Sequence, residues 1–250
     1  MSLCIRLIFL GNLRELLPPR LRRREEVPRV LQERGAIKDV IESMGVVHPE
    51  VGSIEADGRQ VDFSYLVRGG ELVRVAPLPV PCPVRKPTLL RPRPLRRITF
   101  LADINVAKLG RLLRMAGFDT RILPARSSDR TIAHTAAREE RILLSRDRNL
   151  LKYSCVCFAH LVRATDPWEQ LAETVRLYGL VSELRLFSRC PRCNRLLRRV
   201  SRDEVLEQLE PLTRKYYDRF SRCPGCDTIY WQGSHHEKMV SWWKKNFFHP

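Results

Sequence analysis

Two Cys-x-x-Cys pairs near the end of the chain constrain its fold more than any other feature. The pairs comprise Cys190, Cys193, Cys223 and Cys226, and 29 residues separate the first pair from the second. Cysteine pairs at such spacings are typical of a tetrahedral site with four thiolate ligands, and thiolates select Zn²⁺. Because four protein ligands leave no open position for a substrate, we expect a structural zinc site. The first ten residues lack the features of a signal peptide, so we expect a cytoplasmic protein without disulfides between these pairs.

A proline-rich segment divides the chain well before the cysteine pairs. Seven prolines lie in the 18 residues from Pro77 to Pro94. Proline fixes φ and lacks a backbone donor, so this segment is excluded from helices and central strands. We expect an extended, semi-rigid linker over residues 77–96. The chain should therefore fold as separate parts before and after it, with a further boundary at the zinc site: residues 1–76, 97–187 and 188–250.

Residues 1–76 have the pattern of a small β-rich domain. A strand, a second strand, a helix and three short strands predict a β-grasp fold. The helix has apolar residues at helical spacing and stops at Gly45. Gly69 and Gly70 precede the final strand and are expected to form a turn. The expected elements are strands at 4–10, 53–56, 63–67 and 72–76 and a helix at 36–44.

After the linker, apolar strands alternate with amphipathic helices, which predicts a parallel α/β sheet. Ile98–Ala102 is continuously apolar, as a buried parallel strand should be. Ser128 is expected to cap one helix, and Asp166 followed by Pro167 is expected to begin another. The expected strands are 98–102, 120–123, 142–145 and 155–158, and the expected helices end near Gly117, Glu140 and Gly179.

Three aspartates fall where such a sheet would bring them together. Asp103 and Asp147 each follow a predicted strand, and Asp129 lies in the first turn of the helix between them. Ligands of open parallel sheets bind at the carboxyl edge of the strands. Clustered carboxylates suit Mg²⁺ or Mn²⁺, which can activate water and offset phosphoryl charge. The alternative is that Asp103 caps the following helix and Asp129 balances a helix dipole.

The charge of the chain favours a polyanionic partner. The net charge is +17, yet residues 1–80 carry 12 basic and 11 acidic side chains, so the excess lies beyond residue 80. Basic surfaces attract nucleic-acid phosphates. An arginine-rich coding bias is the alternative, although the nearly neutral first 80 residues argue against it. We expect RNA contacts from the cations around the predicted acids: Lys108, Arg111, Arg146 and Arg148.

Four segments resemble one known family in the right order. Phe100–Thr120 and Arg141–Asp147 resemble motifs of the PIN-like ribonuclease domain named for the C-terminal part of the mut-seven exonuclease. Arg189–Asn194 and Arg222–His235 look like the zinc ribbon that ends this family. Upstream, Ile37–Val46 and Gly70–Val73 resemble segments of the ubiquitin-like domains related to sulfur carriers. The final strand there leads into the linker rather than ending in a free Gly-Gly carboxylate, so sulfur-carrier activity is not expected.

The resemblance implies an α/β, PIN-like three-layer sandwich, preceded by a ubiquitin-like β-grasp domain and followed by a zinc ribbon. It further implies metal-dependent cleavage of RNA, with Asp103, Asp129 and Asp147 at matching acidic positions and no clear fourth acid. Two alternatives remain. One is a non-catalytic RNA-binding or ribosome-associated adaptor, and the other is a β-grasp interaction protein whose α/β part is only structural. The ubiquitin-like domain could bind a protein partner, and no membrane span is expected.

Aromatic residues and lysines are interleaved near the end of the chain. Such a pattern can stack on unpaired bases, but it can equally supply the small core of a zinc ribbon or its contact with the nuclease domain. We favour packing. The helix-like spacing of residues 200–209 predicts a helix inserted in the ribbon. His235 and His236 are expected to be surface or phosphate-contacting groups rather than zinc ligands, because the four cysteines already complete the site.

Overall fold

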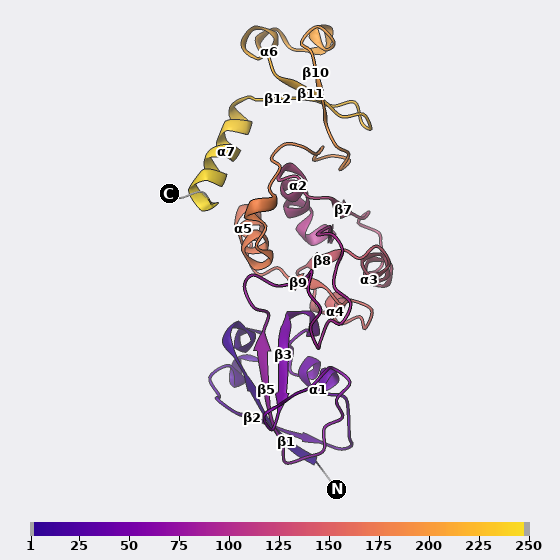
Figure 1. The fold of residues 1–250 in the computed structure, drawn as a ribbon, viewed down its shortest axis with the longest axis vertical. Coiled ribbons are helices and arrows are strands. Elements are labelled where there is room, and N and C mark those ends of the chain that lie inside the picture. The colour runs from indigo at the N-terminus through magenta and orange to yellow at the C-terminus, as the bar shows by residue number, and fades with distance from the viewer. Residues whose placement is uncertain (1–2, 248–250) are drawn as a thin grey trace.

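The computed structural model describes residues 3–247 as an elongated molecule of three stacked parts. The N-terminal sheet, the parallel sheet and a small C-terminal sheet follow one another along the long axis (Figure 1). The last helix returns from the C-terminal sheet toward the middle part. Among the described residues, no helix is both long and apolar enough to span a membrane.

The N-terminal part is a five-stranded sheet with the order β2-β1-β5-β3-β4. The central strands β1 and β5 are parallel, and the other pairs are antiparallel, as in a ubiquitin-like β-grasp. Helix α1 buries its apolar stripe in the same core as the sheet. The elements are β1 (Leu3–Phe9), β2 (Val27–Leu31), α1 (Ile37–Ser43), β3 (Val51–Ala56), β4 (Arg59–Gln60) and β5 (Leu72–Pro77), with 3-10 turns η1 (Gly11–Leu16), η2 (Pro19–Leu21) and η3 (His48–Glu50).

One predicted strand of this part is wrong. Residues 63–67 form turns and a single bridge between Ala36 and Leu66. The cause is local: Asp62 Oδ1 accepts hydrogen bonds from both the amide and the hydroxyl of Ser64, which closes a turn where a strand would begin. The hairpin that begins with β3 is instead completed by the short strand β4, directly after the Asp57–Gly58 turn.

The middle part is a four-stranded, fully parallel sheet with the order β7-β6-β8-β9. Its strands are β6 (Phe100–Ala102), β7 (Thr120–Ile122), β8 (Ile142–Ser145) and β9 (Ala159–Leu161). Its helices are α2 (Ala107–Met115), α3 (Asp129–Arg138), α4 (Arg148–Leu151) and α5 (Pro167–Tyr178), with 3-10 turns η4 (Ile104–Val106) and η5 (Val181–Glu183).

This sheet is the centre of a three-layer sandwich. Phe100 and Ala102 pack in a core with α2 and α5, whereas Leu101 between them packs with α3 and α4. Gly110 lets α2 approach closely, because a Cβ there would lie 2.9 Å from the Cβ of Ala102. The predicted caps are confirmed: Ser128 Oγ accepts from Thr131 N, and Asp166 accepts from two amides at the start of α5.

The fourth strand was predicted too early. Residues 155–158 are turns and bends, and the strand is β9, Ala159–Leu161. A hydrogen bond of 2.9 Å from Val156 N to Tyr153 O closes a turn there. Pairing with β8 begins at Ala159, opposite Leu143.

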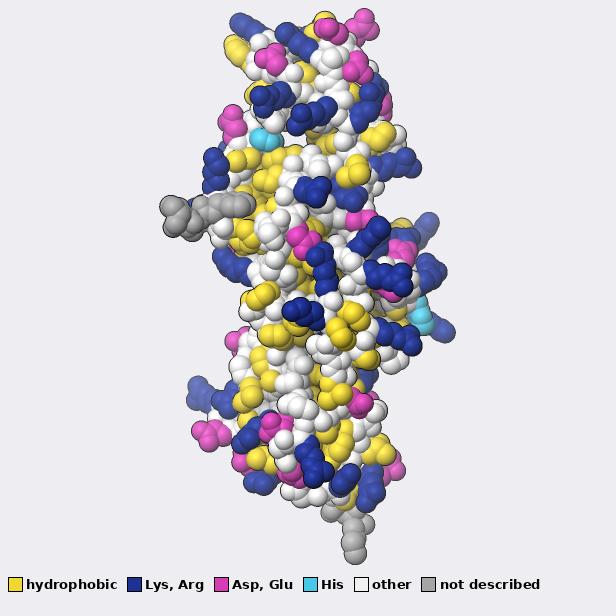
Figure 2. Space-filling view, viewed as in Figure 1, with side chains coloured by type: hydrophobic (Ala, Val, Ile, Leu, Met, Phe, Trp, Pro, Cys, Tyr) yellow, Lys and Arg dark blue, Asp and Glu magenta, His cyan; other side chains and the backbone are white. Residues whose placement is uncertain are grey.

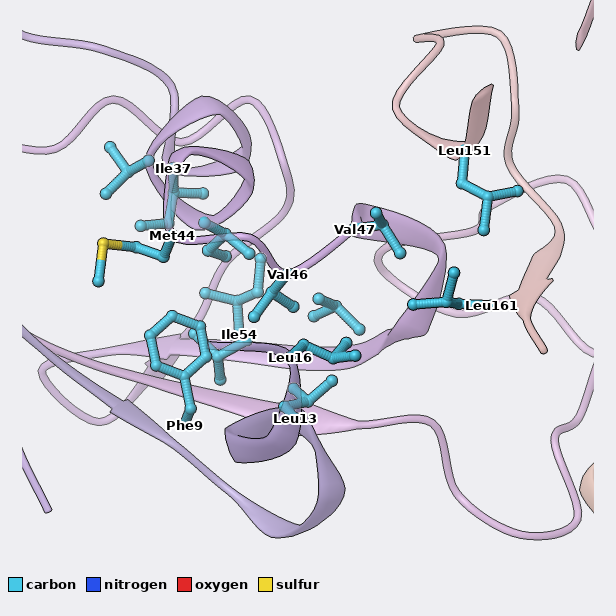
Figure 3. Close-up of a cluster of buried hydrophobic side chains, with 14 of the residues drawn as sticks. Phe9, Leu13, Leu16, Ile37, Met44, Val46, Val47, Ile54, Leu151 and Leu161 are labelled. Carbon is cyan, nitrogen blue, oxygen red and sulfur yellow. The ribbon is translucent and has the colours of Figure 1, made fainter. Parts of the chain in front are cut away.

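The first two parts share one hydrophobic core. Leu13, Leu16 and Val47 of the N-terminal part lie beside Leu151 and Leu161 of the middle part (Figure 3). Burial of such side chains from both sides stabilises the two parts as a unit. The sequence gives no sign of this packing, because each part has its own amphipathic pattern.

The linker is also packed, rather than free to act as a spacer. It lacks helix and strand beyond β5, as predicted, but Cys82, Val84 and Leu95 are buried in the second core, with α2 and α5. Arg91 is 7% exposed. Its guanidinium donates to the carbonyls of Pro49, Val51 and Cys157, which ties the linker to both neighbouring parts.

The C-terminal part is a three-stranded antiparallel sheet, β10-β11-β12. Its elements are β10 (Arg198–Val200), β11 (Phe220–Arg222), β12 (Ile229–Trp231), the turn η6 (Leu206–Gln208), α6 (Pro211–Tyr216) and α7 (Ser234–Phe247). The predicted helix over residues 200–209 is wrong, because hydrogen bonds between Ser201 and Glu204 close a turn and only η6 is helical. The favoured packing of the aromatic residues is confirmed for Trp243, which is fully buried in the second core.

Candidate active site and metal centre

Two of the three predicted acids stand at adjacent strand ends of the parallel sheet. Asp103 follows β6 and Asp147 follows β8, and these strands are direct neighbours. Each aspartate also caps the turn after it: Asp103 Oδ1 accepts from Ile104 N at 2.6 Å, and Asp147 Oδ1 accepts from Asn149 N at 2.7 Å. Capping thus fixes the two side chains at the sheet edge and leaves further carboxylate lone pairs available.

All three predicted acids line a single pocket of about 220 Å³. Asp129 lines it as the first residue of α3. Asn105 and the segment from Leu123 to Ser127 complete the rim. The three carboxylates are not in mutual contact, because among residues 3–247 the cysteines alone bring three or more ligand atoms within 4.8 Å of one another.

The hydroxyl of Ser145 organises this pocket. Ser145 is the last residue of β8 and is fully buried. Its hydroxyl donates to Asp103 Oδ2 at 2.7 Å and accepts from Asp147 N at 2.9 Å. Asn105 Nδ2 donates to the same hydroxyl at 3.2 Å. Neither Ser145 nor Asn105 is among the predicted site residues, although a polar residue that ends the apolar run Ile142–Leu144 is a usable signal.

The donor set of the pocket fits a hard divalent cation. Within the described part of the chain, none of the three aspartates lies within 4.0 Å of a Lys, Arg or His nitrogen. Asp103 is 6% exposed, so its charge is largely removed from water without a cationic partner. Oxygen donors of this type are the ligands that Mg²⁺ and Mn²⁺ prefer, usually together with retained waters.

The four predicted RNA-contacting cations fall into two groups. Lys108, Arg111 and Arg146 are exposed around the acidic pocket or on α2. Arg148 has a different environment, because its guanidinium donates to the carbonyls of Leu16 at 2.9 Å and Gly45 at 3.3 Å. Arg148 therefore braces the N-terminal part against α4.

The four paired cysteines converge in the C-terminal part. Their sulfur atoms all lie within 4.8 Å of one another, with 3.5 Å between Cys190 and Cys226 and 3.2 Å between Cys193 and Cys223. Each pair sits in a similar turn: Asn194 N donates to Cys190 O, and Asp227 N donates to Cys223 O. Four convergent sulfurs fit the tetrahedral geometry of a structural Zn²⁺ and leave no open coordination position.

The first cysteine turn is attached to the parallel sheet and its helix α2. Asn194 accepts from Thr120 N through Oδ1 and donates to Asp119 through Nδ2. Arg114, on α2, donates to the carbonyls of Pro191 and Arg192. Burial alone would raise the pKa of Asp119, but hydrogen bonds from Arg141 and Asn194 outweigh it and lower that pKa. Because Asn194 and Arg114 connect the cysteine turn to the parallel sheet, a zinc ion bound by the cysteines would stabilise the edge of that sheet as well as the ribbon.

A second polar cluster, missed by the sequence analysis, lies between the first two parts of the molecule. His160 of β9 contacts Glu50 of η3 through Nδ1 and Glu173 of α5 through Nε2, each at 2.9 Å. Arg163 pairs with Glu50 at 3.1 Å. Burial disfavours the charged imidazole, but the charges and hydrogen bonds of the two glutamates outweigh it and raise the pKa of His160 to about 9.

Two family models match the chain. The model described as Mut7-C RNAse domain matches residues 98–243, which include the acidic pocket and the cysteine cluster. The model described as Mut7-C ubiquitin matches residues 2–82. A search of curated proteins finds no match.

Proposed function

We propose that this chain, a member of the Mut7-C RNAse domain family, hydrolyses RNA phosphodiester bonds at the acidic pocket with a bound Mg²⁺ or Mn²⁺. Family membership supports a nuclease-like function in general. The single observation that supports the pocket is that Asp103, Asp129 and Asp147, from three separate elements, line it without a cationic partner in the described chain. A protein that only binds polyanions gains nothing from such uncompensated carboxylates.

The residues of the pocket have distinct roles in this proposal. Asp103 is held by two hydrogen bonds, from Ile104 N and the Ser145 hydroxyl, so its carboxylate is oriented before substrate binds. Asp147 is held by its capping bond and presents its other oxygen at the same edge. The bound cation would supply an activated water and offset charge on the scissile phosphate. Asp129, at the start of α3, would complete the oxygen donor set.

The substrate is held by basic side chains outside the pocket. Lys108 and Arg111 lie on α2, which is joined to Asp103 by the turn η4, and Arg146 directly precedes Asp147. These three cations would bind phosphates on either side of the scissile bond, because phosphate contacts fix position without reading sequence. Arg148 supports this surface indirectly, by bracing α4 against the N-terminal part.

The zinc ion has a structural role in this proposal. We place it on Cys190, Cys193, Cys223 and Cys226, where it holds the C-terminal sheet and, through Asn194 and Arg114, the edge of the nuclease domain.

We further propose four segments: a ubiquitin-like domain at 1–76, a packed linker at 77–96, the nuclease domain at 97–187, and the zinc ribbon with its tail at 188–250. The ubiquitin-like domain is the candidate surface for a protein partner. Its exposed apolar side chains include Val30 and Leu66, 63% and 58% exposed.

Cleavage of a labelled RNA by the full chain tests this proposal. Protein dialysed free of added divalent ions should be inactive, and Mn²⁺ or Mg²⁺ should restore activity. Zinc content should be measured in each sample, so that loss of the structural ion is not mistaken for loss of the catalytic one. RNA binding without cleavage under every metal condition would instead favour the adaptor function.

A further inference from the structure

We infer that the C-terminal part holds a second RNA site, a groove that stacks and binds unpaired nucleotides. The groove has a volume of about 1020 Å³ and lies between the β10-β11-β12 sheet, the chain entering it from the nuclease domain, and the start of α7. That the RNA bound in this groove is a substrate of the acidic pocket rests on the proposed ribonuclease function. We call it the ribbon groove and define it by six of its lining residues: Phe187, Arg199, Tyr217, Arg219, Trp231 and His236.

Aromatic rings form two small platforms in the ribbon groove. The rings of Tyr217 and Trp231 have centroids 6.5 Å apart, and Trp231 is 42% exposed. The rings of Phe187 and His236 lie nearly face to face, with centroids 4.0 Å apart and 32° between their planes. Trp231 is the exposed ring of the four, whereas Tyr217, Phe187 and His236 are half-buried. A base would stack on Trp231 and on the outer faces of the half-buried rings, and such stacking does not depend on base sequence.

Two of the three arginine side chains that line the groove make neither a hydrogen bond nor an ion pair in the described part of the chain, whereas that of Arg189 donates to backbone carbonyls. Arg199 on β10 and Arg219 beside β11 make no ion pair with any acid in the described part of the chain. The one acid that lines the groove, Asp218, is paired with Arg202 at 3.7 Å. Figure 2 shows Lys and Arg side chains beside hydrophobic ones over the C-terminal part of the molecule. The groove is therefore net positive as well as aromatic, which is the combination that holds a single strand by its bases and phosphates.

Single-stranded RNA fits these features better than a duplex or an apolar protein segment. A duplex hides the faces of its bases in the stack, so the aromatic platforms would have nothing to contact. An apolar segment would bury Arg199 and Arg219 without partners, which costs free energy. The phosphates of a single strand would pair with these two arginines while its bases stack on the aromatic rings.

Helix α2 connects the ribbon groove with the acidic pocket. Met115, at its last turn, lines the groove, and the turn η4 joins Asp103 to its start. Lys108, Arg111 and Met115 are spaced three and four residues apart, so they follow one face of the helix. Nine helical residues span roughly 14 Å, or roughly four nucleotides of a stacked strand. Because the turn η4 separates Asp103 from the start of α2, a single strand must be longer than that to reach both sites.

Neighbouring residues provide matched controls. Arg198 and Arg199 are adjacent on β10 and so point to opposite faces of the sheet. Arg199 lines the groove, whereas Arg198 pairs with Glu204 at 3.3 Å. Tyr216 is 64% exposed and lies outside the groove, beside Tyr217. Each substitution in the groove thus has a control of the same charge or aromatic type within the same small sheet.

The test measures binding of a fluorescent 12-nucleotide single-stranded RNA to the full chain without added divalent ions. We expect Trp231→Leu to raise Kd about tenfold, and Arg199→Gln to raise it several-fold and to lower the salt slope by about 0.7. Tyr216→Leu and Arg198→Gln should stay within about twofold of the wild type. A duplex of the same sequence should bind more weakly and should not respond to Trp231→Leu.

Equal effects of Arg199→Gln and Arg198→Gln, or unchanged binding by Trp231→Leu, would overturn the inference. If the Trp231→Leu variant loses zinc, the comparison of Arg199→Gln with Arg198→Gln decides the test. Both arginine side chains are exposed, so their substitution should leave the ribbon folded. Cleavage of the 12-mer and of a trinucleotide separates this result from the proposed function. If RNA binding depends on the groove residues but no metal supports cleavage, the nuclease proposal is refuted and the groove is not. If the 12-mer is cleaved and the groove substitutions change neither its binding nor its cleavage, the second RNA site is refuted and the nuclease proposal is not.

Discussion

The hydroxyl of Ser145 donates a hydrogen bond of 2.7 Å to Asp103 Oδ2, and the same hydroxyl accepts from the backbone amide of Asp147. A single buried side chain therefore links two of the three acids across adjacent strands. This link makes the geometry of the acidic pocket sensitive to a residue that does not have to touch the substrate.

Ser145→Ala should leave Asp103 Oδ2 and the Asp147 amide without that partner. We expect a loss of about 1–3 kcal/mol in the free energy of unfolding, because buried polar groups would be left unsatisfied. Cleavage should fall about 10- to 100-fold, in line with the loss of a residue that orients metal ligands. Rate and thermal unfolding, measured together, check both effects. Ser154→Ala, an exposed serine of the same domain, is the control, and equal behaviour of the two variants would contradict the role of Ser145.

Much of the nuclease-like fold could be predicted from the sequence because its signals are local. Ile142–Ser145 is a strand with the predicted bounds, and α5 begins at the Asp166 cap and ends at Gly179, which has a left-handed φ of 63°. The four cysteines converge as their spacing predicts. In each case one short stretch of residues determines the conformation.

The rest depends on contacts between distant residues. The strand at 155–158 was misplaced because its apolar pattern continues into Ala159–Leu161, and pairing with β8 selects the later residues. The hydrogen bond between Glu50 and His160 joins residues that are 110 positions apart in the sequence. Ser145 escaped notice because its importance lies in the hydroxyl network, which no spacing reveals.

The cluster around His160 predicts a pH dependence of stability. The pKa of His160 in the folded state is raised to about 9 from the ordinary 6.5. The contribution of His160 to the free energy of unfolding is therefore complete below pH 6.5 and is lost as the pH rises through about 9. Burial alone would raise the pKa of Glu50, but the charge and the hydrogen bond of His160 outweigh burial and lower it. The stabilisation that the Glu50 carboxylate contributes to the folded state is therefore lost as the pH falls below the ordinary value of 4.5.

Thermal unfolding of the full chain between pH 6 and pH 10 measures this contribution. His160→Gln should be less stable than the wild type at pH 6, and the difference should shrink as the pH approaches 9 and above. His134→Gln, on the exposed side of α3, is the matched control and should follow the wild type. A difference that stays constant over the whole range would show that His160 does not carry a charge in the folded state.

The cysteine cluster predicts one firmly bound zinc ion per chain. Structural zinc contributes an apparent 10–16 kcal/mol at about neutral pH, so Cys193→Ser should unfold the ribbon. The first core, which holds the ubiquitin-like part, does not include the ribbon and should remain folded. Zinc analysis and limited proteolysis check this, with new cuts expected within residues 188–233.

Cys157→Ser is the control for that substitution, since Cys157 is exposed and lies outside the cluster. It should keep one zinc ion and the wild-type proteolysis pattern. Purified wild-type protein without zinc, or with a disulfide between the two cysteine pairs, would contradict the structural metal site.

The rate of Mn²⁺-dependent RNA cleavage by Asp103→Asn and Asp147→Asn tests the acidic pocket most directly. Asparagine keeps the size of each side chain and remains a good helix cap, so both variants should fold. We expect cleavage to be abolished in both, with RNA affinity equal to or above that of the wild type, because a repulsive carboxylate leaves the phosphate path. Asp39→Asn, exposed at the start of α1, should cleave normally. Full activity in both pocket variants, or cleavage that needs no metal, would contradict the assignment of this pocket as the nuclease site.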